Sequence, residues 1–87
     1  MMGGGARNVI LIIYSDNPDF EPIEVDIVGA KIAPPLMFHV DEIGVEYSAE
    51  RNAYIFWGPG TPSFIGWIRV ADASPRLKEF IASCDLL

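Results

Sequence analysis

The stretch Tyr54–Val70 constrains the fold more than any other part of this 87-residue chain. Two apolar, aromatic-rich runs flank a breaker cluster at Gly58–Pro62, which is typical of two β-strands joined by a turn. Side chains alternate between the faces of a strand, and both faces are apolar here: Tyr54 and Phe56 share one face, and the residue after each of them points to the other. A strand that is apolar on both sides must be covered on both sides.

Four further segments have the composition or alternation of strands. They are Asn8–Tyr14, Pro22–Ile32, Leu36–Val40 and Val45–Glu50. The first is apolar on both faces and is predicted to be an interior strand. In the second, apolar and acidic residues alternate until the alternation breaks near Gly29, where we expect a bulge or a bend.

The period changes from two to 3.6 residues near the C-terminus. Ser74 is a good N-cap and Pro75 fits the first helical turn. Apolar residues then recur at helical spacing and form one stripe: Leu77, Phe80, Ile81 and Cys84. The pattern predicts a C-terminal amphipathic helix of about three turns.

Strands followed by one helix predict an α+β domain, with five to six mostly antiparallel strands and the helix packed on them. One such helix covers one face of a few strands, so the second face needs another cover. A curled sheet or a half-open barrel would provide it within the monomer, and a dimer interface would provide it from outside. We expect residues 1–7 to be a flexible tail and residues 8–87 to form a single domain.

The composition indicates a surplus of apolar material for so small a core. Hydrophobic residues make up 51% of the chain, and the mean hydropathy is +0.28. No apolar run approaches the roughly 18 to 20 residues of a membrane-spanning helix, so no membrane partner is expected. The surplus favours a protein interface, formed with a second copy or with another protein.

The charge distribution argues against nucleic-acid binding. The net charge is −6, which repels a phosphate backbone. Nine of the acidic residues lie within residues 16–50, where Lys31 is the one basic residue, so an acidic first half precedes a mildly basic second half. This division predicts either pairing within the monomer or electrostatic complementarity between chains.

The candidate interface consists of aromatic residues around the breaker cluster: Tyr54, Phe56, Trp57, Phe64 and Trp67. A competing ligand site is His39 with Asp41, because residues i and i+2 of a strand share a face. No spacing in the chain matches a zinc signature, and no cofactor or metal is predicted. The single cysteine excludes an internal disulfide.

These patterns predict a non-catalytic interaction module, either self-associating as a dimer or serving as a small subunit of a larger assembly. The alternative is a small-ligand-binding or catalytic module that uses His39, Asp41 and the aromatic turn of Trp57, Phe64 and Trp67. Binding of single-stranded nucleic acid ranks last because of the net charge. Without a recognisable signal peptide, the expected location is cytoplasmic.

Overall fold

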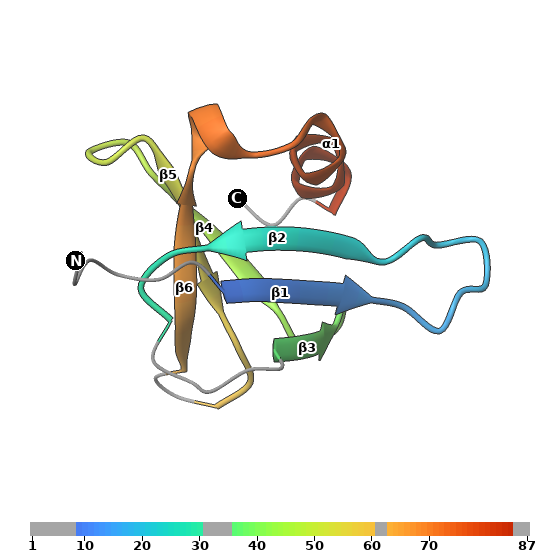
Figure 1. Ribbon diagram of the computed structural model, residues 1–87. Coiled ribbons are helices and arrows are strands. Elements are labelled where there is room, and N and C mark those ends of the chain that lie inside the picture. The colour runs from blue at the N-terminus through green and yellow to red at the C-terminus, as the bar shows by residue number, and fades with distance from the viewer. Residues whose placement is uncertain (1–8, 31–35, 61–62, 85–87) are drawn as a thin grey trace, which may run out of the picture.

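The N-terminal strand β1 (Val9–Tyr14) is the centre of a three-stranded sheet in the computed structural model (Figure 1), which describes residues 9–30, 36–60 and 63–84. It pairs antiparallel with β2 (Ile23–Ile27) and parallel with β3 (Leu36–His39). Interior placement of this β-branched strand was predicted from its composition and is confirmed. The predicted residues 1–7 tail lies outside the described residues.

The second sheet is an antiparallel meander of three strands, with β5 at its centre. Its strands are β4 (Gly44–Ser48), β5 (Ala53–Trp57) and β6 (Phe64–Arg69). The register between β5 and β6 shifts at Phe56 and Trp57. The predicted aromatic hairpin is therefore the β5–β6 pair, and part of its turn, residues 61–62, lies outside the described residues.

The two sheets meet where β2 approaches β6. Val28 and Trp67 form an isolated antiparallel bridge through two backbone hydrogen bonds of 2.8 and 3.0 Å. Gly29 follows with φ of +75°, a conformation that side chains with a Cβ rarely adopt. The bend predicted at Gly29 is thus present, and it ends the pairing of β2 with β6 after one bridge.

The core lies between the sheets and beneath helix α1 (Pro75–Cys84), which follows a 3₁₀ turn at Val70–Asp72 (Figure 1). Ser74 caps the helix as predicted, because its Oγ accepts the Leu77 N–H at 3.1 Å. The helix buries its predicted apolar stripe through Leu77, Phe80 and Ile81, whereas the side chain of Cys84 is outside what the structure describes. The largest fully buried side chains are Phe56, Leu11, Ile13, Ile27, Ile65, Leu77, Ile81 and Val25.

The α+β class is confirmed, but the expected arrangement of five to six strands in one curled sheet or half-open barrel is corrected. In the part of the chain that the structure describes, six strands form two three-stranded sheets that do not close. The strands β1 and β3 are also parallel, which the expectation of mostly antiparallel pairing did not specify. Among the described residues, one bridge, between Val28 and Trp67, joins the two sheets, and the bend at Gly29 ends their pairing on the C-terminal side of Val28. Among the described helices, none has the length and apolar character needed to cross a membrane.

Candidate functional site

The outer face of the second sheet carries a group of partly buried apolar side chains. The register pairs Ile55 with Trp67 and Trp57 with Phe64. The rings of Trp57 and Phe64 contact each other edge to face, with centroids 5.7 Å apart. We call Ile55, Trp57, Phe64 and Trp67 the aromatic face.

The aromatic face points away from the core. On the other side of the same strands, Phe56 is 0% exposed and Ile68 is buried. Alternation along a strand then directs Ile55 and Trp57, and likewise Trp67, to the outer side. Because Trp67 also lies against Gly29, where a Cβ would be 3.0 Å from the indole Nε1, its ring is held in place at the junction of the sheets.

Two exposed charges of opposite sign border the aromatic face. Glu46 on β4 lies across from Ile55, and its carboxylate accepts the indole N–H of Trp57 at 3.0 Å. Arg69 follows Trp67 by two residues on β6 and therefore shares its side of the sheet. No ion pair joins Glu46 and Arg69 within the described part of the chain. The face thus has an acidic border on one edge and a basic border on the other.

The five predicted interface residues do not form one surface. Trp57 and Trp67 lie on the outer side by alternation, and Phe64 joins them because it pairs with Trp57 beyond the register shift. Phe56 is in the core, and Tyr54 is partly buried and packs against that core. Phe56 is therefore not part of the aromatic face, because its side chain has no exposure in this fold.

Sequence reasoning missed three members of this surface: Ile55, Glu46 and Arg69. Alternation already placed Ile55 beside Trp57, so this residue could have been found from the strand pattern. The positions of Glu46 and Arg69 depend on the cross-strand register, which the sequence does not specify.

The predicted ligand pair, His39 and Asp41, is brought together by the structure at the end of β3. The Nδ1 of His39 lies 3.4 Å from Asp41 Oδ2 and accepts the Asp41 backbone N–H at 3.1 Å. The Nε2 lies 3.2 Å from Asp16 Oδ2, without the alignment of a hydrogen bond. The His39 ring packs edge to face on Tyr14 of β1, with centroids 5.4 Å apart.

This arrangement joins loops rather than building a metal centre. The carboxylates of Asp16 and Asp41 approach opposite nitrogens of His39, so both cannot bind one ion together with the ring. No group of three or more His, Cys, Asp or Glu side chains suited to a metal ion occurs among residues 9–30, 36–60 and 63–84. His39 belongs to the first sheet, and the aromatic face belongs to the second. The two parts of the predicted ligand site, His39 with Asp41 and the aromatic turn, thus belong to different sheets.

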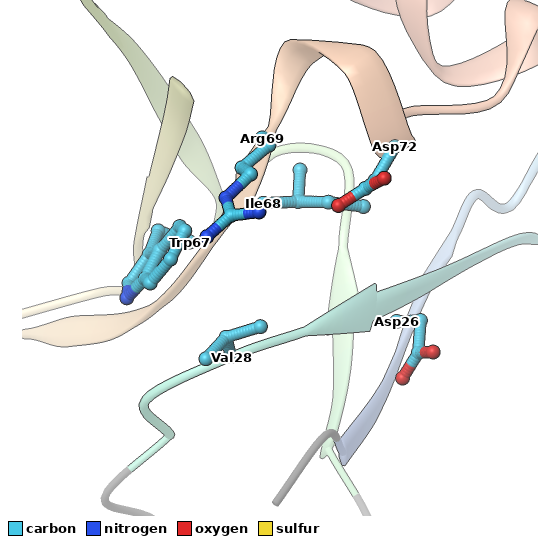
Figure 2. A pocket seen from close by; sticks show the side chains of 6 residues that line it. All are labelled: Asp26, Val28, Trp67, Ile68, Arg69 and Asp72. Atoms are coloured by element: carbon cyan, nitrogen blue, oxygen red, sulfur yellow. The ribbon is translucent and has the colours of Figure 1, made fainter. Parts of the chain in front are cut away.

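A cleft of about 450 Å³ opens beside the β2–β6 junction (Figure 2). It is lined by Asp26, Val28, Trp67, Ile68, Arg69 and Asp72. Figure 2 shows the carboxylates of Asp26 and Asp72 at the end of the cleft opposite Trp67. Asp26 of the first sheet and Trp67 of the aromatic face thus line the same cleft.

Comparison with known proteins does not identify a relative. The chain matches no protein-family model, and no curated protein or solved structure shows significant similarity to it.

Proposed function

We propose that this protein is a non-catalytic interaction module that self-associates as a dimer through the aromatic face. The observation that supports this function is the position of Trp57, Phe64 and Trp67 on the side of the second sheet that faces away from the core. Trp and Phe are enriched at the centres of protein interfaces, where a buried ring stabilises the complex most.

The charges at the borders of the face suit a second copy of the same chain. A two-fold axis parallel to β5 would place β4 of one copy over β6 of the other. Glu46 of each copy would then lie over Trp67 of the other copy. Arg69 is the next residue on the same face of β6, about 7 Å further along the strand, and would also lie near this Glu46. Both carboxylates would meet guanidinium groups, although the chain as a whole carries a charge of −6.

Charge reversal tests this function without disturbing the core, because Glu46 and Arg69 are both exposed. We expect Glu46→Arg and Arg69→Glu each to raise the dimer dissociation constant by about tenfold or more, since each single change opposes like charges. The double variant should restore most of the wild-type affinity. Native mass spectrometry and sedimentation equilibrium would give the subunit count and the dissociation constant.

Two outcomes would distinguish self-association from the alternatives. A wild-type chain that is monomeric at all concentrations rules out the homodimer, and the module would then have to serve as a subunit of a larger assembly. Reversals that weaken a dimer without recovery in the double variant would show that Glu46 and Arg69 do not pair across the interface, and would contradict the proposed two-fold arrangement. Met37→Glu is the matched control, because Met37 is exposed on the other sheet.

A further inference from the structure

The first sheet also has an outer face with exposed apolar side chains. Leu11 and Ile13 of β1 are 0% exposed and point into the core, so alternation turns Ile10 and Ile12 outward. Ile10 is 46% exposed, and Met37 on β3, which pairs with Ile12, is 55% exposed. Among the residues that the structure describes, no helix or strand passes in front of β1, β2 and β3 in Figure 1.

An acidic column lies directly beside these apolar side chains. On β2, Asp26 pairs with Ile10 and Glu24 pairs with Ile12, and both carboxylates are exposed. Neither carboxylate has an ion pair or a hydrogen bond with any residue that the structure describes. The strands β1, β2 and β3 contain no Lys or Arg. We call Ile10, Ile12, Met37, Glu24 and Asp26 the acidic face.

A second copy of this chain is a poor partner for the acidic face. Two copies packed through it about a two-fold axis would set the carboxylates of β2 against each other or against Met37, depending on the direction of the axis. In the described part of the molecule, neither arrangement places a basic side chain of β1, β2 or β3 against these carboxylates, so they would leave water without a positive partner, which is costly. The basic residues that the structure describes lie on other elements: Arg51, Arg69, Arg76 and Lys78.

We propose that the acidic face docks a basic amphipathic helix of a different protein. Residues i and i+4 of a helix are about 6 Å apart along its axis, close to the roughly 7 Å between same-face residues of a strand. An apolar stripe at this spacing would cover Ile10 and Ile12 and extend over Met37. Lys or Arg residues beside that stripe would reach Glu24 and Asp26, because adjacent strands are about 4.8 Å apart. This surface lies on the first sheet and the aromatic face on the second, and the two adjoin at the cleft lined by Asp26 and Trp67. The proposal does not depend on self-association.

The probe is a fluorescent synthetic helix of about 18 residues, five turns long, with a Leu stripe flanked by Lys. We expect it to bind the full chain, with its amide chemical-shift changes confined to β1, β2 and β3. Binding should weaken as the salt concentration rises from about 0.01 to 0.15 M, since salt screens exposed charges. A peptide of the same pattern with Glu in place of Lys should not bind.

Variants separate the docking surface from general attraction to an acidic protein. The double variant Glu24→Gln/Asp26→Asn should weaken binding of the Lys peptide by at least tenfold and remove most of its salt dependence. Ile10→Thr and Met37→Thr should each weaken it by about threefold to tenfold while retaining the fold, because both positions are exposed. Glu50→Gln and Glu79→Gln, which neutralise exposed acids elsewhere, should leave it unchanged.

Three results would overturn the proposal. The first is no binding of the Lys peptide. The second is an equal loss of binding in Glu50→Gln or Glu79→Gln, which would indicate attraction to net charge alone. The third is a change in subunit count caused by Met37→Thr, which would assign the acidic face to a second copy. None of these results depends on whether the aromatic face forms a dimer.

Discussion

Trp57 and Glu46 are joined across the β4–β5 pair by a hydrogen bond of 3.0 Å from the indole Nε1–H to the carboxylate. This contact fixes the orientation of the Trp57 indole on the aromatic face while leaving the Glu46 side chain exposed. The same carboxylate is the acidic border that the proposed dimer requires. Glu46 therefore orients the Trp57 ring in the monomer and, in the proposed dimer, supplies the negative charge at the interface.

The two roles of Glu46 can be separated by two substitutions. Glu46→Gln keeps an oxygen acceptor for Trp57 but removes the charge, so we expect unchanged monomer stability and a dimer dissociation constant raised about threefold to tenfold. Glu46→Ala removes the acceptor as well and should lower the free energy of unfolding by about 0.5–1 kcal/mol. Urea titration at a monomeric concentration, followed by sedimentation, measures both quantities. Equal dimer affinity in Glu46→Gln and wild type would contradict the charge contribution.

Ser74 should stabilise the C-terminal helix through its side-chain oxygen. Its Oγ accepts the Leu77 N–H at 3.1 Å, and its carbonyl accepts the Lys78 N–H at 3.1 Å. Ser74→Ala loses the first of these bonds and should lower the free energy of unfolding by about 1 kcal/mol. Ser74→Asp retains an acceptor and places a negative charge at the helix N-terminus, so it should match wild type. The measurement is thermal unfolding followed by circular dichroism. Equal destabilisation of Ser74→Ala and Ser74→Asp would contradict the capping role of the Ser74 side chain.

Arg76 connects the helix to the loop between β1 and β2. Its guanidinium lies 3.2 Å from the Glu21 carboxylate, also donates to the Glu21 carbonyl oxygen, and is 5.7 Å from the centre of the Phe20 ring. Arg76→Lys keeps the charge but loses the planar group, so the free energy of unfolding should fall by about 0.5–1 kcal/mol. Lys78→Met removes a charge from the same helix and is the control. Equal stability of Arg76→Lys and wild type in urea titrations would show that this contact contributes nothing measurable.

The elements of this fold were predictable because their signals are local. Strand and helix positions follow from the side-chain period and from caps such as Ser74, which act within a few residues. The division into two sheets was not predictable, because it depends on which strands lie next to each other. The parallel pairing of β1 with β3 and the single bridge between Val28 and Trp67 are relations between distant segments.

The candidate surface was predictable only in part, for the same reason. The alternation around Trp57 separates its face from that of Phe56, but the identity of the buried face depends on where the rest of the chain packs. The contact of His39 with Asp41 was accessible from spacing, whereas its approach to Asp16 arises from the alignment of Tyr14 with His39 in neighbouring strands. Long-range register thus determines which of the predicted residues meet.

Gly66 allows β6 to approach β2 at the junction of the two sheets. A Cβ at Gly66 would lie 2.7 Å from Ile27 Cδ1 and 3.1 Å from the Val28 carbonyl oxygen, which accepts the Trp67 N–H. Gly66→Ala should therefore lower the free energy of unfolding by about 1–3 kcal/mol through overpacking. Gly44→Ala is the matched control, because its nearest neighbour would be a backbone oxygen 4.0 Å away. Urea unfolding measures both variants, and amide exchange at Val28 and Trp67 should quicken in Gly66→Ala alone. If the two variants were equally stable, β2 and β6 would not be in the close contact that joins the two sheets.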